Sequence, residues 1–235
     1  MTRAGPRPVE TVGVLGGTFD PPHLGHLHAA LAVRGAFALE RVLLVPCAVP
    51  PHKRRADLTE AFHRLAMARL AVEACPGLEV ATLELEREGP SYTIDTLRAL
   101  ERGSPPLRPL LIVGWDALLD LPTWHRHEEL VSEFDVVAVH RSPESDAGPE
   151  RRPDASLARR VVEVPAESGA GAALESGRED AGGRIYRLMV PPVLVSSSRV
   201  RALAAASAPL AGLVPTEVDR YIQAHRLYRR KEEAR

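Results

Sequence analysis

Short apolar runs separated by longer amphipathic stretches set the pattern of this chain. Runs of this length, bounded by Gly, Pro or charged residues, are typical of buried strands. They predict strands at residues 11–15, 41–46, 110–113, 135–140 and 185–190. Residues 78–85 alternate apolar and charged positions and predict a strand with one exposed face.

Helical spacing fills the segments between these strands. It predicts helices at residues 23–33, 59–74 and 93–100, a short one after Asp116, another from near Trp124, one opening at residues 195–201 and a last one at 215–227. Thr59 is expected to cap the second of these helices, and Thr93 or Ser91 the third. The buried positions expected for the helix at 59–74 are Phe62, Leu65, Ala66, Leu70 and Val72.

The order of these elements predicts the fold class. A strand, a helix and a strand follow one another within about 35 residues, which indicates a right-handed βαβ unit with parallel strands. We therefore expect an α/β fold, a single domain over residues 11–228 with a doubly wound (Rossmann-like), mostly parallel sheet flanked by helices. Residues 1–10 are expected to be a disordered leader, and residues 229–235 a solvated charged tail.

One stretch of the chain departs from this pattern. Residues 144–183 are rich in Gly, Ala, Ser, Pro and charged residues, and only 161–164 look ordered. Such a composition buries too little apolar surface to order itself, so we expect a flexible insertion here.

Composition narrows the function classes. The 235-residue chain has a net charge of −1, so no general attraction to nucleic acid or to a membrane surface is expected. No apolar stretch reaches the roughly 20 residues of a membrane span. The two cysteines, Cys47 and Cys75, fit a reducing compartment, and a cytoplasmic protein is expected. Without further Cys or His partners at zinc spacing no metal site is expected, and residues 125–127 (His-Arg-His) are interpreted as a solvated helix face.

The first candidate chemistry lies in residues 11–28. A buried strand ends in a Gly-Gly pair, Asp-Pro-Pro forces an extended turn, and a helix opens at His23. The N–H groups and the dipole at a helix start favour an anion. His23 and His26 lie on one face of the first turn, and Gly25 between them leaves room for a phosphate.

Residues 195–201 (Val-Ser-Ser-Ser-Arg-Val-Arg) form a second candidate anion site. One hydroxyl would be explained as a helix cap, but three in a row followed by Arg201 exceed what a cap requires. Helix-start N–H groups, hydroxyls and a guanidinium together suit a polyphosphate, because each charge-assisted hydrogen bond contributes about 1.5–3 kcal/mol.

A basic run, Pro-Pro-His-Lys-Arg-Arg, occupies residues 50–55 after the second strand. It could be an ordinary solvated charge run. Ligands of such sheets gather at the carboxyl ends of the strands, however, and the run stands beside the first motif. Its position therefore favours contact of Lys53 with a phosphate.

Both anion motifs resemble those of one superfamily. Gly-Gly-Thr-Phe-Asp-Pro-x-His-x-Gly-His resembles the His-x-Gly-His signature of the nucleotidyltransferases, and residues 195–201 resemble their Ile-Ser-Ser-Thr-x-Ile-Arg motif with three mild substitutions. The resemblance implies that His23 and His26 face the phosphates of a nucleoside triphosphate. Arg199, at the variable position, inherits no role.

Two further segments resemble one branch of that superfamily, the bacterial nicotinate-nucleotide adenylyltransferases. They are Ser-Tyr-Thr-Ile-Asp-Thr-Leu at residues 91–97, and Gly-Trp-Asp followed by Leu-Pro-Thr-Trp within residues 114–124. The resemblance covers nearly the whole chain apart from residues 1–10 and 144–183. It implies that Asp116 holds the nucleotide ribose, that Trp124 stacks on the pyridine ring and that Thr93 offers a backbone contact to the nicotinate carboxylate.

The motifs that the sequence contains, and those that it lacks, favour direct in-line transfer of a phosphoryl or nucleotidyl group. No Gly-x-Ser-x-Gly elbow, Walker lysine motif or Cys–His pairing offers another chemistry. Positioning and charge neutralisation supply most of the acceleration in such transfers. The expected reaction transfers the adenylyl group of ATP to nicotinate mononucleotide, with Mg²⁺, giving deamido-NAD and pyrophosphate in NAD biosynthesis. The expected catalytic residues are His23, His26 and Arg201, and the expected ATP-binding and phosphate-binding residues are Gly16, Gly17, Thr18, Phe19, Lys53, Ser196, Ser197 and Ser198.

Two other interpretations stay open. A phosphopantetheine adenylyltransferase would share the first motif and a serine motif, but would not be expected to carry the segments at 91–97 and 116–124. A nucleotide-sensing module would bind without turnover, and the intact His23, His26 and Arg201 argue against it. A homo-oligomer is possible, and the sequence leaves the oligomeric state open.

Overall fold

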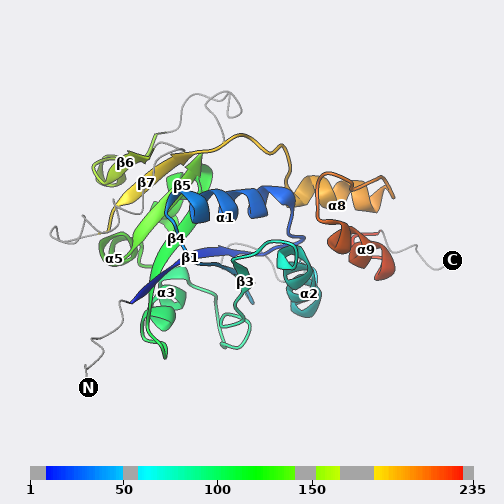
Figure 1. Ribbon diagram of the computed structural model, residues 1–235, viewed down its shortest axis with the longest axis horizontal. Helices are drawn as coiled ribbons and strands as arrows, with labels where there is room; N and C mark the ends of the chain where they lie inside the picture. Colours follow the sequence, from blue (N-terminus) through cyan, green and yellow to red (C-terminus); the bar gives the residue numbers. More distant parts are fainter. Residues whose placement is uncertain (1–8, 50–57, 141–151, 165–182, 230–235) are drawn as a thin grey trace, which may run out of the picture.

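The computed structural model describes residues 9–49, 58–140, 152–164 and 183–229. In this part of the chain seven strands form one sheet in the order β3-β2-β1-β4-β5-β7-β6, and every neighbouring pair is parallel (Figure 1). The strands are β1 (Glu10–Gly17), β2 (Val42–Pro46), β3 (Leu78–Val80), β4 (Leu107–Gly114), β5 (Asp135–His140), β6 (Val161–Val164) and β7 (Ile185–Met189). The predicted doubly wound parallel sheet is thereby confirmed, with its direction of winding reversing between β1 and β4.

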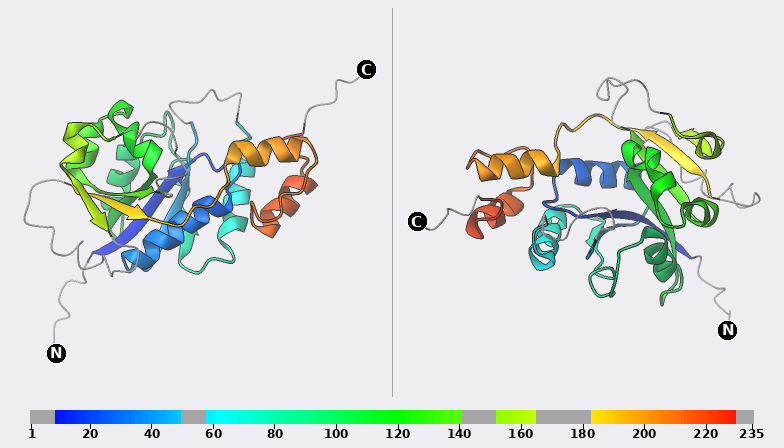
Figure 2. Two further views of the ribbon diagram at one scale, coloured as in Figure 1. Left: turned by 90° about the horizontal axis from the view of Figure 1, so that it is seen from above. Right: turned by 180° about the vertical axis from the view of Figure 1, so that it is seen from behind.

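Helices connect the strands and cover both faces of the sheet. They are α1 (Leu24–Ala36), α2 (Ala61–Val72), α3 (Thr93–Glu101), α4 (Trp115–Leu119), the 3₁₀ turn η2 (Leu121–Thr123), α5 (His127–Glu133), α6 (Ala155–Ala158), α8 (Ser197–Ala205) and α9 (Thr216–Ala224). In Figures 1 and 2, α1 lies on one face and α3 on the other, whereas α8 and α9 lie together beyond the carboxyl end of β1.

Two apolar cores hold these helices on the sheet. Successive side chains of a strand point to opposite faces. In β4, Leu110 and Ile112 therefore belong to the core that α1 covers, and Leu111 and Val113 to the core that α3 covers. Strands buried on both faces need apolar residues at nearly every position, which is why continuous apolar runs predicted them correctly.

The prediction for the helix at 59–74 is wrong in its cap and in part of its buried face. Thr59 is used elsewhere: its N–H donates to Asp20 Oδ2 (3.2 Å) and its carbonyl accepts from Arg64 Nε (2.9 Å), so the helix begins at Ala61. The expected apolar face forms only in part: Leu70 and Val72 pack against the core while half-buried, whereas Phe62 is 57% exposed. The side chains that α2 buries are Arg64, Met67, Ala68 and Ala71.

Other boundaries and one cap also differ from the sequence prediction. The strand expected at 78–85 ends at Val80, because the next residues form a turn in which Leu85 N–H donates to the Thr82 carbonyl (2.8 Å). No side chain caps α3, since the Ser91 hydroxyl accepts instead from the N–H of Ala48 (3.1 Å). α5 begins at His127 rather than near Trp124, because the backbone is extended at Trp124 and left-handed at Arg126 (φ 54°).

Much of the expected leader, insertion and tail lies outside the described residues. Within 144–183 the structure describes residues 152–164 and 183, and it places α6 and the edge strand β6 there. The expected order at 161–164 is therefore confirmed. Over the described ranges no helix has both the length and the apolar character needed to cross a bilayer.

An ion-pair network joins α3 to α5. Arg98 of α3 donates to Glu133 Oε2 (2.8 Å) and to Glu129 Oε2 (2.9 Å) of α5. Arg126, the residue before α5, donates to Glu129 Oε1 (2.7 Å). Hydrogen bonds from Arg126 and Arg98 lower the pKa of Glu129 from 4.5 to about 2. The network ties α5, from its first turn to its last residue, to Arg98 of α3.

We expect Glu129→Gln to lower stability at neutral pH and to flatten its loss in acid. A carboxylate with a lowered pKa contributes stability above its unfolded pKa of 4.5 and loses that contribution as pH falls toward 2. The measurement is the free energy of unfolding in urea from pH 7 down to about pH 3. Glu128→Gln, exposed in the same helical turn, is the control. If Glu129→Gln loses stability in acid as steeply as wild type, the assignment is wrong.

Candidate active site

The carboxyl end of β1 leads into a buried loop, residues 18–22. Phe19 and Asp20 are each 1% exposed, and Phe19 adopts a left-handed φ of 47°. Carbonyl groups in a buried loop need donors because water does not reach them. In this loop the carbonyls of Thr18, Asp20 and Pro21 each accept a hydrogen bond from a side chain distant in the sequence.

Arg64 supplies the first of these donors from α2. Its side chain is 1% exposed, and its Nη1 donates to the carbonyls of Thr18 (2.9 Å) and Cys47 (2.8 Å). Its Nε donates to the Thr59 carbonyl. One guanidinium therefore fixes the ends of β1 and β2 to α2. Sequence reasoning missed this role, and the available signal was an arginine among the apolar residues of a helix.

The serine motif supplies the other two donors from the first turns of α8. Ser197 Oγ donates to the Pro21 carbonyl (3.0 Å), and Arg201 Nη1 donates to the Asp20 carbonyl (2.7 Å). Arg201 Nη2 also donates to Ser198 Oγ (3.3 Å). The two predicted anion motifs, about 180 residues apart in the chain, thus lie against each other.

Ser196 has the capping role that the sequence left open for one serine. It is the N-cap of α8, and its hydroxyl accepts from the N–H of Arg199 (3.2 Å). Arg199 itself donates to the Leu194 carbonyl (3.1 Å), away from the loop contacts made by Arg201.

The Asp20 carboxylate is a second anchor of the loop. Its Oδ1 accepts from the Tyr228 hydroxyl (2.7 Å), near the end of the described chain, and its Oδ2 accepts from Thr59 N–H. Burial, and then the neighbouring Asp20 charge, raise the pKa of Tyr228 far above its usual value. The hydroxyl therefore stays protonated and acts as a donor.

His23 and His26 stack on each other where α1 begins. Their ring centroids are 3.6 Å apart at 19°, and His23 N–H donates to His26 Nδ1 (3.2 Å). The ring of Phe19 contacts His26 edge-on at 5.1 Å. Because His26 Nδ1 is an acceptor here, a neutral His26 carries its proton on Nε2. That N–H is the group that His26 can offer to an oxygen ligand.

Gly25 has a packing role that the sequence did not predict. A Cβ here would lie 3.1 Å from His23 Nδ1 and 3.2 Å from Val195 Cγ1. The absent side chain leaves room for the His23 ring and for the segment leading into α8. Room for a phosphate stays a prediction.

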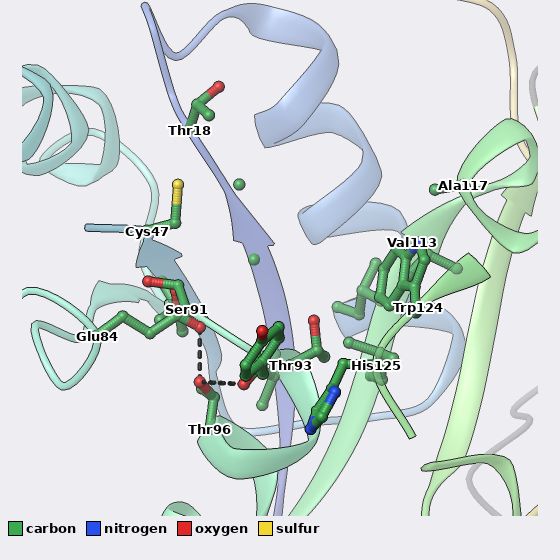
Figure 3. Close-up of a pocket in the computed structure, with 17 residues that line it drawn as sticks. Thr18, Cys47, Glu84, Ser91, Thr93, Thr96, Val113, Ala117, Trp124 and His125 are labelled. Atoms are coloured by element: carbon green, nitrogen blue, oxygen red, sulfur yellow. Dashed lines mark hydrogen bonds between the residues drawn. The ribbon is translucent and has the colours of Figure 1, made fainter. Parts of the chain in front are cut away.

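A pocket of about 420 Å³ opens at the carboxyl ends of β1, β2 and β4 (Figure 3). Its base is apolar, and polar groups gather on the walls contributed by the β1 end, by the start of α3 and by the loop after η2. The lining residues are Val14, Gly16, Gly17, Thr18, Val45, Cys47, Glu84, Ser91, Tyr92, Thr93, Thr96, Leu111, Ile112, Val113, Ala117, Trp124 and His125. An apolar base with a few convergent polar groups is typical of a small-molecule site.

The walls of this pocket bring predicted and unpredicted residues together. Thr93 and Trp124 both line it, as expected for one substrate site. Glu84 is buried (6% exposed) and accepts from the Thr96 hydroxyl at 2.6 Å. His125 also lines the pocket and stacks on Tyr92; it is exposed, as the sequence predicts, but it precedes α5 rather than lying on a helix.

Asp116, another predicted substrate residue, lies apart from the pocket. Asp116 is exposed in the first turn of α4, directly after β4, and is not among the lining residues. Its neighbour Trp115 is held by Arg187, whose guanidinium carbon lies 4.6 Å from the indole centroid, and by the His140 ring at 5.0 Å. Lys53, in the basic run, lies outside the described residues. Within those residues, no three or more His, Cys, Asp or Glu side chains gather as they would around a metal ion.

The chain matches a family model and curated relatives along most of its length. Residues 14–203 match the model described as cytidylyltransferase-like. The probable nicotinate-nucleotide adenylyltransferase of Symbiobacterium thermophilum is 44% identical over 221 residues, which cover 94% of this chain and 96% of that protein. The protein of the same name from Pseudomonas aeruginosa is 38% identical over 219 residues, covering 93% and 97%.

Solved structures share the fold. The Plasmodium falciparum nicotinic acid mononucleotide adenylyltransferase complexed with NaAD superposes with a TM-score of 0.67 at 19% identity, covering 93% of this chain and 97% of that one. A putative nicotinate-nucleotide adenylyltransferase from Vibrio parahaemolyticus superposes with a TM-score of 0.61 at 12% identity, covering 95% and 98%.

We expect Arg64→Leu to lower the free energy of unfolding by about 3 kcal/mol or more, because it removes charged donors from buried carbonyls. Arg69→Leu, which removes an exposed arginine from the same helix, is the matched control and should change stability by less than about 0.5 kcal/mol. Urea denaturation followed by circular dichroism measures both. Equal stabilities for the two variants would contradict the anchoring role of Arg64.

Proposed function

Because this chain belongs to the cytidylyltransferase-like family, and within it to the nicotinate-nucleotide adenylyltransferases, we propose that it transfers the adenylyl group of ATP to nicotinate mononucleotide. The products are deamido-NAD and pyrophosphate. The observation that carries the proposal is the pocket that shares Gly16, Gly17 and Thr18 with the loop leading to the His23–His26 pair. A mononucleotide in the pocket would point its phosphate at a triphosphate bound at the starts of α1 and α8.

The chemistry is a single in-line displacement. An oxygen of the mononucleotide phosphate attacks the α-phosphorus of ATP, the bond from the α-phosphorus to the bridging oxygen breaks, and pyrophosphate leaves with that oxygen. His23 and His26 would donate to the triphosphate and stabilise the charge that develops at the α-phosphate. Arg201 and Ser197 would hold the departing pyrophosphate.

The geometry around Arg201 supports its part in this scheme. Two of its guanidinium nitrogens already donate to Asp20 and Ser198, which fixes the plane of the group. A guanidinium has five N–H donors, so further donors remain for phosphate oxygens. Ser198 and the loop residues 16–19 would add contacts to the phosphates, as would Lys53. Ser196 acts mainly as the cap of α8.

We propose Mg²⁺ as the counter-ion of the ATP phosphates. Mg²⁺ usually keeps several waters and binds phosphates with few protein ligands. The buried Asp20 carboxylate is already engaged by Tyr228 and Thr59, so it suits the role of a loop anchor. The cytoplasmic location and a possible homo-oligomer stay predictions.

The pyridine end of the substrate would lie against Trp124. Trp124 would stack on the ring, the first-turn N–H groups of α3 at Thr93 would donate to the ring carboxylate, and Asp116 would hold a nucleotide ribose. A backbone contact from Trp124 itself is ruled out, because its N–H donates to the Leu121 carbonyl (2.8 Å).

The decisive test is pyrophosphate release from ATP and Mg²⁺ with a panel of acceptors. The panel contains nicotinate mononucleotide, its amide counterpart and phosphopantetheine. Release that depends on the pyridine mononucleotides supports the proposal. Release with phosphopantetheine alone, or nucleotide binding without any release, would overturn it.

We expect His26→Ala and Arg201→Ala each to lower kcat by about 10²–10³, because each removes a preorganised donor to the transition state. Arg199→Ala is the matched control, since it removes an exposed guanidinium from the same turn of α8. Circular dichroism and thermal unfolding check that the variants fold. Near wild-type kcat in a folded His26 or Arg201 variant would remove that residue from the mechanism.

We expect kcat/KM for the acid mononucleotide to exceed that for the amide by roughly ten- to a hundredfold. The two oxygens of a carboxylate can each accept a hydrogen bond from an N–H group in the first turn of α3. The nitrogen of an amide accepts none and leaves one buried N–H group unpaired, at a cost of about 1–3 kcal/mol. Trp124→Ala should weaken both substrates without reversing the preference, and Trp124→Phe should restore much of the loss. Equal values for acid and amide in the wild type would refute this selectivity.

A further inference from the structure

Asp20 joins distant parts of the chain beside the two anion motifs. Its carbonyl accepts from Arg201 Nη1 (2.7 Å), and its carboxylate accepts from the Tyr228 hydroxyl (2.7 Å). The other carboxylate oxygen accepts from Thr59 N–H (3.2 Å). Asp20 is 1% exposed, so bulk water does not replace a contact that is lost. The position of the carbonyl that receives Arg201 therefore depends on the contact between Tyr228 and the carboxylate of the same residue.

The chain that follows α9 turns so that Tyr228 reaches this position. Arg226 has a left-handed φ of 52°, and its N–H donates to the Gln223 carbonyl (3.2 Å). The N–H of Leu227 donates to the Ile222 carbonyl (3.0 Å), which completes the Schellman pattern that ends a helix. Tyr228 is also left-handed, with a φ of 65°. Such a backbone is unfavourable for a residue with a side chain and persists where surrounding contacts hold it.

α2 supports this segment at two tyrosines. The Tyr228 hydroxyl lies 4.0 Å from Met67 Sδ, and both side chains belong to the core that α1 covers. The Tyr221 hydroxyl of α9 forms a hydrogen bond with His63 Nδ1 of α2 (2.9 Å). In Figures 1 and 2, α9 lies beside α2. The hydroxyl of Tyr228 thus contacts the buried loop, whereas that of Tyr221 contacts the helix.

We infer that Tyr228 is a positioning residue for the adenylyl transfer and acts through Asp20 on the guanidinium of Arg201. The inference rests on the proposed function, in which Arg201 holds the departing pyrophosphate. Without the Tyr228 hydroxyl, the Asp20 backbone loses one of its anchors, and the guanidinium that donates to it shifts with it. A displacement of about 1 Å can slow a positioned reaction by about a hundredfold. The pocket walls come from other elements, α3 and the loop after η2, and keep their geometry.

The test is kcat for pyrophosphate release by Tyr228→Phe, which removes the hydroxyl and keeps the ring. We expect kcat to fall about tenfold, because Arg201 is displaced but still present. KM for nicotinate mononucleotide should stay within about twofold of the wild-type value, because the pocket is unchanged. Tyr221→Phe is the matched control: it removes the neighbouring hydroxyl, which contacts His63, and should keep the wild-type kcat.

A double-mutant cycle with Arg201→Ala separates positioning from stability. Tyr228→Phe should lower the thermal stability of both backgrounds, because Asp20 loses a hydrogen bond in each. If Tyr228 acts through Arg201, adding Tyr228→Phe to Arg201→Ala should lower kcat no further. A merely structural role would lower kcat by the same factor in both backgrounds. Saturating substrates stabilise the folded state, and each kcat is referred to the folded fraction measured by circular dichroism at the assay temperature.

The outcomes are distinct. A wild-type kcat in Tyr228→Phe overturns the inference. An equal loss in Tyr221→Phe also overturns it, because it assigns the effect to the packing of α9 on α2. The same factor in both backgrounds of the cycle overturns the route through Arg201. Each of these results leaves the proposed function intact, whereas failure of the wild type to release pyrophosphate with the pyridine mononucleotides overturns the proposed function and this inference with it.

Discussion

The structure depends on one constraint: a loop at the end of β1 is buried, and its carbonyls must be satisfied by side chains. Arg64, Ser197 and Arg201 meet this need from α2 and α8. An unpaired buried carbonyl would lower the stability of the fold by about 1–3 kcal/mol. Side chains from distant parts of the chain therefore supply the donors. The same contacts bring the starts of α1 and α8 together, where both helix dipoles can act on one anion.

The candidate site is consequently divided into two parts with different chemistry. At the helix starts, donors predominate: the stacked histidines, the serine hydroxyls and the Arg201 guanidinium suit a polyphosphate. In the pocket, an apolar base and aromatic walls suit a ring. The loop carrying Gly17 and Thr18 belongs to both parts, so it is the point at which the two substrates would meet.

The reversal of strand order explains why the phosphate motif and the pocket lie side by side at the carboxyl ends of β1 and β4. β1 is in the middle of the sheet, with β2 on one side and β4 on the other. Connections leave the carboxyl ends of these strands toward opposite faces, which opens a crevice there. α1 leaves toward one core and α3 and α4 cover the other, so the phosphate motif and the pocket are formed at the same end of the sheet.

The sequence by itself determined the parallel fold and indicated both candidate anion motifs, and the family resemblance implied that Thr93 and Trp124 belong to one substrate site. Continuous apolar runs and helix-start residues are local signals, because burial on both faces and capping act within a few residues. The tertiary structure alone decided that Thr59 serves Asp20 rather than its helix, that Arg64 is buried, that Gly25 accommodates the His23 ring, and that His125 lines the pocket. Each of these depends on partners from distant segments, and residue order does not reveal which buried carbonyl or ring a side chain will meet.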